Sequence, residues 1–169
     1  MKSASIRAAL LGAVLLQPAL AAVAHALEVG EAVPPVELRD GTQAFTLAAE
    51  DGKVTYIDFW ASWCGPCRQS FPWMNEMQQK YGAQGLRIVG VNLDAEAADA
   101  QKFLASLPAG FTIAYDPEGE SAQRFGVQGM PTSVLAGRDG KVIFQHAGFN
   151  RADADELEKA IRAALGAQP

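Results

Sequence analysis

The chain has 169 residues, a length that fits one ordinary domain. Apolar residues make up 49% of it, which is enough to fill a core, and charged residues make up only 20%. The formal net charge of −5 excludes a chain-wide basic surface for nucleic acid, so no nucleic-acid partner is expected.

The first 26 residues have the pattern of a signal peptide. Lys2 and Arg7 form a short positive region, an apolar run follows, and Ala24-His25-Ala26 matches a small-x-small cleavage site. The run is shorter than the about 20 apolar residues that a membrane span needs. We therefore expect an exported protein with a mature domain at residues 27–169. An uncleaved N-terminal anchor is the alternative, because further apolar residues prolong the run.

Two short apolar segments and a longer one predict the first strands. Residues 36–38 and 44–47 flank Arg39-Asp40-Gly41, a turn sequence, and predict a small hairpin or an edge unit of the sheet. Residues 53–60 combine β-branched and aromatic side chains, which favours a buried strand.

A helix is predicted after this strand, because Pro66 suits a first helical turn. Apolar side chains then recur at three- and four-residue steps, at Phe71, Met74, Met77 and Tyr81. Pro72 lacks an N–H group and is expected to kink the helix, and Gly82 and Gly85 are stop signals.

The second half of the chain alternates between the two kinds of element. The predicted elements are strand 86–93, helix 95–107, strand 111–115, helix 120–125, strands 132–136 and 141–146 around an Asp-Gly turn, and helix 151–165. Strands that alternate with helices and end in a hairpin and a helix indicate an α/β fold. We expect a mixed central sheet flanked by helices.

Cys64 and Cys67 are the only cysteines, and they form one C-x-x-C motif. A structural staple is a weak interpretation, because the loop between them is too short to remove much chain entropy. Cys64 is expected at a helix N-terminus, where thiol pKa values fall from about 8.5 to ~3.5–7.5. We therefore expect Cys64 to attack, Cys67 to resolve, and a mixed disulfide to form with a substrate thiol.

This chain resembles thioredoxins in two segments and at one further proline. Residues 56–67, which read YIDFWASWCGPC, resemble their active-site segment, and Pro72 matches their helix-kinking proline. Residues 129–132, which read GMPT, resemble their cis-proline loop. The resemblance extends from about residue 34 to residue 165 and implies a thioredoxin-like fold.

The resemblance also implies roles for individual residues. Asp58 corresponds to a buried carboxylate that exchanges a proton with Cys67; the competing interpretation is a strand-end carboxylate that reaches solvent. Pro131 corresponds to a cis-proline that keeps a backbone edge open for substrate, against an ordinary trans turn. The substrate-binding residues are then Trp63, Gly65, Pro66, Met130 and Pro131. Trp63 is either an exposed apolar rim or a core residue.

An expected helix and strand at about residues 95–115, inserted before the cis-proline loop, resemble the bacterial TlpA/ResA/CcmG group. That resemblance implies a periplasmic reductant of protein disulfides that serves cytochrome c or copper-centre maturation. It also implies a membrane electron donor of DsbD/CcdA type and no cofactor beyond the redox-active disulfide. The Gly65-Pro66 dipeptide resembles the reducing end of the fold, whereas a disulfide oxidant or isomerase is the alternative.

Two sites depart from the pattern of this group, and Gly90 departs from the pattern of cytoplasmic thioredoxins. Ser70 stands where some reductases of apocytochrome c carry a glutamate, and Thr132-Ser133 stands where an acidic residue often follows the proline. Both departures weaken a specific role in haem attachment and leave the general reductase function intact. Gly90 lies near the position of a lysine in cytoplasmic thioredoxins and removes one partner of Asp58.

Four other functions are alternatives to disulfide exchange. A zinc site needs two more ligands, and His146 is the one histidine after the leader, so no metal site is expected. Copper handling stays open, because soft thiolates bind Cu(I). A related peroxidase needs a Thr-x-x-Cys setting that Cys64 lacks. A non-catalytic module would hold the cysteines in an inert disulfide.

Overall fold

The computed structural model describes residues 27–47 and 52–166. The expected signal peptide at residues 1–26 lies outside the described residues. Within the described part of the chain, no helix is long and apolar enough to cross a membrane.

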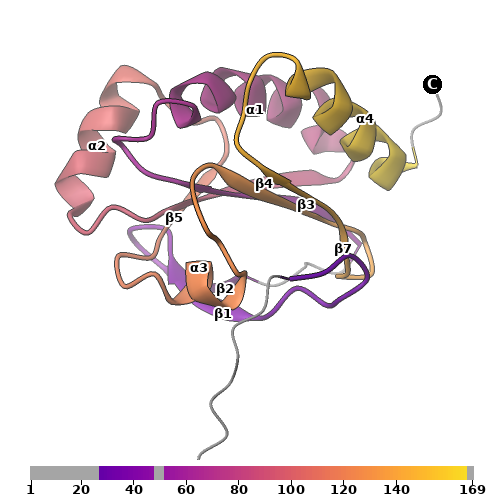
Figure 1. The fold of residues 1–169 in the computed structure, drawn as a ribbon, viewed down its shortest axis with the longest axis horizontal. Helices are drawn as coiled ribbons and strands as arrows, with labels where there is room; N and C mark the ends of the chain where they lie inside the picture. Colours follow the sequence, from indigo (N-terminus) through magenta and orange to yellow (C-terminus); the bar gives the residue numbers. More distant parts are fainter. Residues whose placement is uncertain (1–26, 48–51, 167–169) are drawn as a thin grey trace, which may run out of the picture.

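The elements follow one another as expected from the sequence (Figure 1). The strands are β1 Val36–Arg39, β2 Ala44–Leu47, β3 Val54–Trp60, β4 Leu86–Asn92, β5 Thr112–Tyr115, β6 Thr132–Ala136 and β7 Val142–Ala147. The helices are α1 Cys67–Tyr81, the 3₁₀ turn η1 Gly82–Gln84, α2 Ala97–Ser106, α3 Glu120–Arg124 and α4 Asp153–Leu165. The expected helix and strand before residue 129 are α2 and β5.

Seven strands of the described residues form one mixed sheet in the order β2-β1-β5-β4-β3-β6-β7. The pairs β3–β4 and β4–β5 are parallel, whereas β3–β6 and β6–β7 are antiparallel. All seven residues of β3 are buried, because strands pair with it on both sides and helices cover its face. The predicted α/β fold with a mixed sheet is confirmed, and so are both predicted hairpins.

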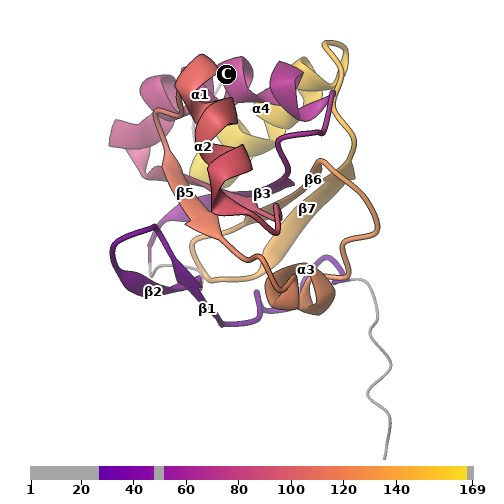
Figure 2. The same cartoon turned by 90° about the vertical axis from the view of Figure 1, so that its left-hand side faces the viewer.

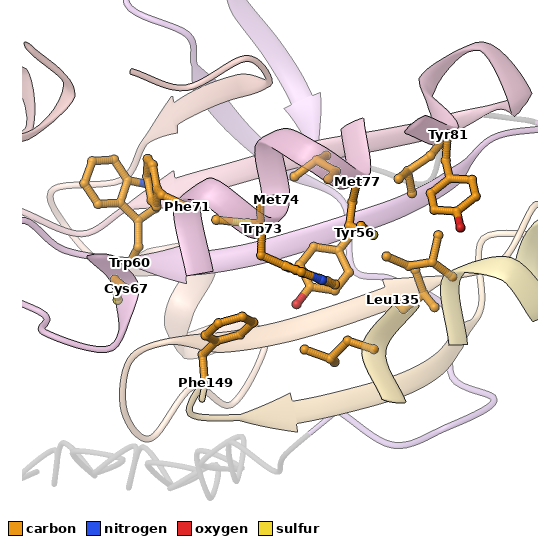
Figure 3. Packing of buried hydrophobic residues seen from close by; sticks show 14 of the residues in the cluster. Tyr56, Trp60, Cys67, Phe71, Trp73, Met74, Met77, Tyr81, Leu135 and Phe149 are labelled. Carbon is orange, nitrogen blue, oxygen red and sulfur yellow. The ribbon is translucent and has the colours of Figure 1, made fainter. Parts of the chain in front are cut away.

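The helices divide between the two faces of the sheet. Helices α1, α2 and α4 lie on one side, and α3 lies on the other (Figures 1 and 2). Alternate residues of a strand point to opposite faces. Tyr56 and Trp60 of β3 therefore belong to a first apolar cluster, which packs with α1 and α4. Ile57 and Phe59 belong to a second apolar cluster on the opposite face of the sheet. Figure 3 shows Trp60 at one end of the first cluster, beside the start of α1.

Two helices begin later than expected. Helix α4 begins at Asp153 rather than residue 151, because a polar turn precedes it: Asn150 Oδ1 accepts the N–H of Ala152 at 2.8 Å. Helix α2 begins at Ala97, because Glu96 has an extended backbone. Pro72 lies inside α1, and the expected kink there stays a prediction.

Candidate active site

Cys64 and Cys67 form a disulfide between the end of β3 and the start of α1, with an S–S distance of 2.04 Å. Cys67 is the first residue of α1, and its backbone N–H donates a hydrogen bond to Sγ of Cys64 at 3.2 Å. The first N–H groups of a helix lack partners within the helix and stabilise negative charge placed there. This geometry favours a thiolate on Cys64 when the disulfide opens.

The two cysteines are covered, whereas the chain beside them is open to solvent. Cys64 is 4% exposed and Cys67 is not exposed at all, in the order expected for an attacking and a resolving sulfur. Gly65 and Pro66 between them are exposed. Trp63 is 73% exposed, so its indole forms an apolar rim in solvent and does not pack in the core.

Asp58 is 1% exposed, on the face of β3 that it shares with Tyr56 and Trp60. It does not reach solvent at the end of the strand. Its Oδ1 accepts a hydrogen bond from Oγ of Ser133 at 2.7 Å, and its Oδ2 is buried without a partner in the described structure. Burial raises the pKa of Asp58 from an ordinary 3.8 to about 7, although the Ser133 hydrogen bond opposes the rise.

Gly90 lies directly opposite Asp58 in the parallel pairing of β3 with β4. A Cβ atom at position 90 would lie 3.0 Å from the Phe111 ring and 3.2 Å from the Trp60 indole nitrogen. Phe111 belongs to the segment that leads into β5, so this segment occupies the space that a longer side chain would need. The described structure therefore has no cationic side chain at position 90 to favour ionised Asp58.

The Met130–Pro131 peptide bond is cis, as expected from the GMPT segment. Thr132, the first residue of β6, pairs with Phe59 of β3. Pro131 therefore lies at the end of β3 from which the chain continues to the cysteines. Met130 is partly buried against the cluster that contains both cysteines. The expected substrate-binding residues thus gather at one end of the sheet.

Asp94, a buried carboxylate next to the turn before Cys64, is a site residue not predicted from the sequence. Asp94 is 6% exposed, and Oδ2 accepts hydrogen bonds from the backbone N–H of Ser62 at 2.9 Å and from Asn92 Nδ2 at 2.8 Å. Its Oδ1 accepts a bond from the hydroxyl of Ser62 at 3.0 Å. Asp94 therefore anchors the turn that leads to Cys64. Parallel strands β3 and β4 end side by side, and this is the signal that could have linked the two segments.

Two other positions from the sequence analysis have structural roles. Ser70 is buried, and its hydroxyl donates to the carbonyl oxygen of Cys67 at 3.1 Å. His146 is half-buried on β7, with Nε2 3.3 Å from Oδ2 of Asp153 but without hydrogen-bond geometry. Among residues 27–47 and 52–166, no group of three or more His, Cys, Asp or Glu side chains is placed to hold a metal ion.

Residues 28–161 match the protein family described as Redoxin. The chain is 32% identical over 137 residues to the thiol-disulfide oxidoreductase ResA of Bacillus thuringiensis subsp. konkukian. This alignment covers 80% of this chain and 78% of the relative. The chain is 36% identical over 139 residues to the thiol:disulfide interchange protein CycY of Rhizobium leguminosarum bv. viciae, and this alignment covers 80% of this chain and 73% of that relative.

Solved structures include a close match to the fold. A crystal structure from Chlorobium tepidum, described as a thiol:disulfide interchange protein DsbE, superposes with a TM-score of 0.81 at 55% sequence identity. The match covers 83% of this chain and 100% of that chain.

Proposed function

The chain belongs to the Redoxin family and is a thiol–disulfide oxidoreductase, and from this premise we propose that it reduces protein disulfides in the periplasm. The observation that carries the proposal is the Cys64–Cys67 disulfide at the start of α1, beside an exposed Trp63 and above a buried strand. An attacking sulfur, a covered resolving sulfur and an open rim are the parts that disulfide exchange needs.

The first chemical step is attack by Cys64 on a substrate disulfide. In the reduced protein the Cys64 thiolate forms a new S–S bond to one substrate sulfur. The substrate's own S–S bond breaks, and its second sulfur leaves as a thiolate. The N-terminus of α1 stabilises the attacking thiolate, since the N–H of Cys67 points at its sulfur.

The second step releases the substrate. Cys67 gives its proton to Asp58, and the Cys67 thiolate attacks Sγ of Cys64. The Cys64–Cys67 bond forms, the mixed disulfide breaks, and the remaining substrate sulfur leaves. Two electrons have then passed to the substrate, whose two thiolates take up protons. Asp58 suits this role, because a base with a pKa of about 7 is half ionised near neutral pH.

The substrate contacts the open end of the sheet. We assign its binding to Trp63, Gly65 and Pro66 on one side of the disulfide and to Met130 and Pro131 on the other. The indole of Trp63 is a large apolar surface left in solvent, which is typical of a protein contact. The order of strands supports the assignment, because β6 brings Pro131 to the end of β3 that leads to Cys64.

The sequence supports the proposed direction of electron flow and the proposed periplasmic location. The leader pattern at residues 1–26 favours export, and Gly65-Pro66 resembles the reducing end of the thioredoxin fold. An exported reductant must be recharged, and we assign this to a membrane electron donor of DsbD/CcdA type. We propose that the protein supplies electrons for cytochrome c maturation. Supply of electrons for the assembly of a copper centre is the second candidate role.

The redox state of the protein in living cells tests this proposal. Cells are quenched in acid, and free thiols are labelled with a maleimide that adds visible mass. The chain has only two cysteines, so the mass shift reports the Cys64–Cys67 pair directly. We expect mainly the dithiol in cells that contain the membrane donor and mainly the disulfide in cells that lack it. A disulfide in both strains would contradict a reductant.

A further inference from the structure

Ser133 holds one oxygen of the buried Asp58 carboxyl. Ser133 is 3% exposed, and its hydroxyl donates to Oδ1 of Asp58 at 2.7 Å. The other oxygen, Oδ2, is fully buried and has no hydrogen-bond partner within the described residues. The two oxygens of the carboxyl therefore differ: one is capped by a donor and the other is free to carry a proton.

The register of the sheet creates this contact. Asp58 of β3 and Ser133 of β6 are directly opposite in the antiparallel pairing. Cβ atoms of such pairs lie about 4.5–5.5 Å apart, so a short hydroxyl reaches the carboxyl. A slip of one residue would move Ser133 to the other face of the sheet. Pro131 lies two residues before Ser133, so one strand carries both the substrate-binding loop and the partner of Asp58.

We propose that Ser133 is a positioning residue for disulfide exchange, which caps Oδ1 of Asp58 and so makes Oδ2 the oxygen that exchanges a proton with Cys67. The inference rests on the proposed role of Asp58. Ser133 stabilises the ionised carboxyl, since it donates to it, and thereby keeps a buried acid ionisable at neutral pH. Without the hydroxyl, burial would act unopposed on the pKa of Asp58, and a larger share of the carboxyl would be protonated at neutral pH.

No side chain of β3, β4 or α1 in the described structure replaces Ser133 as a hydrogen-bond donor to Asp58. Tyr56 shares the face of β3, and its pKa lies well above the usual range, because burial and then the charge of Asp58 oppose ionisation. Gly90 faces Asp58 from β4 and has no side chain. On α1 the titratable buried side chains are Cys67 and, at the far end, Tyr81 (Figure 3).

On the side of Ser133 away from Asp58, the described residues place one titratable pair, His146 and Asp153. His146 of β7 is the next residue in register beyond Ser133, and its Nε2 faces Asp153 of α4. The buried side chains of α4 are Leu157 and Ile161, which do not titrate. His146 is separated from Asp58 by β6, so Ser133 is the hydrogen-bonding side chain that contacts the carboxyl.

The first test is the titration of the Asp58 carboxyl in the oxidised protein, where neither cysteine titrates. It is followed by ¹³C NMR of the labelled carboxyl. Ser133→Ala should raise the midpoint by about one pH unit, because a lost hydrogen bond to the anion favours the neutral acid. Ser133→Thr, which keeps the hydroxyl, should retain the wild-type midpoint. Ser121→Ala, which removes a buried hydroxyl bonded to Asp116, should also retain it.

The second test is the resolving step. A mixed disulfide of Cys64 with thionitrobenzoate is prepared, and release of the coloured thiol follows attack by Cys67. Ser133→Ala should slow release about fivefold at pH 7, because the ionised fraction of Asp58 falls from about a half to about a tenth. The two rates should converge near pH 9.

An unmoved carboxyl midpoint in folded Ser133→Ala would overturn the proposal. A moved midpoint with an unchanged release rate would also overturn it, since Ser133 would then tune Asp58 without affecting exchange. Failure of the proposed function has a different signature. The wild-type protein would not release the probe through Cys67 at all, although its carboxyl titration would still respond to Ser133.

Discussion

The Cys67→Ser variant should accumulate covalent complexes with its substrate proteins. Cys64 would still attack a substrate disulfide, but no second sulfur would be present to release the product. Multiple-turnover reduction of a protein disulfide should therefore fall to the level of the uncatalysed reaction. Complexes are detected as high-mass bands that disappear on treatment with a reductant, and mass spectrometry of the bands identifies the partners.

Cys64→Ser is the matched control for this trap. It removes the attacking sulfur and leaves Cys67, which is fully buried, so it should form no complexes. Equal trapping by both variants would contradict the assignment of Cys64 as the attacking residue. An absence of complexes in reduced Cys67→Ser, mixed with a disulfide substrate, would contradict disulfide exchange itself.

The Asp58→Asn variant should abolish most of the pH dependence of stability between about pH 4 and pH 7. Asp58 has a pKa of about 7 in the folded protein and an ordinary value of 3.8. Between these values the folded state binds more protons than the unfolded state, so the free energy of unfolding falls as pH rises. A pKa difference of this size corresponds to a loss of about 4 kcal/mol, complete above pH 7.

The substitution separates this effect from other titrations. Asparagine leaves a buried N–H₂ group without a partner, at a pH-independent cost of about 1–3 kcal/mol. The variant should therefore gain about 1–3 kcal/mol at pH 8 and lose that amount below pH 4. Glu158 has a lowered pKa, owing first to its hydrogen bond with Lys80, and it contributes equally to both proteins. Denaturant unfolding of the oxidised proteins measures the difference, and parallel curves would refute the assignment.

The same variant should slow the resolving step. A free thiol with a pKa of about 8.5 is only a few per cent thiolate at pH 7, so an unassisted Cys67 still reacts slowly. Loss of the Asp58 base should therefore reduce the rate by about 10–100-fold at pH 7 and by little above about pH 9. A uniform loss at every pH would indicate structural damage rather than loss of a proton acceptor.

Those parts of the site that depend on the local order of residue types could be predicted from the sequence. The run of β-branched and aromatic residues at 53–60 correctly predicted a buried strand, and the resemblance to thioredoxins correctly predicted that the Asp58 carboxyl is buried within it. Residues 129–132 correctly predicted the cis bond before Pro131 through their resemblance to a known loop. Helix boundaries were less accurate, since polar turns such as the one at Asn150 can begin or precede a helix.

Contacts that depend on register could not be predicted in this way. The bond from Ser133 to Asp58 requires β6 to pair antiparallel with β3 in one particular register, across 75 residues of sequence. The anchor from Asp94 to Ser62 requires two parallel strands to end side by side. Periodicity indicates which residues point inward but not which partner each will meet.

The equilibrium reduction potential of the Cys64–Cys67 pair tests the central claim most directly. The purified protein is equilibrated in defined dithiol–disulfide buffers, and the fraction of dithiol is measured by labelling with a thiol reagent. A reductant held at the reducing end of the thioredoxin fold should have a potential below about −200 mV. A value above about −150 mV would place the protein among the disulfide oxidants and contradict the proposed direction of electron flow.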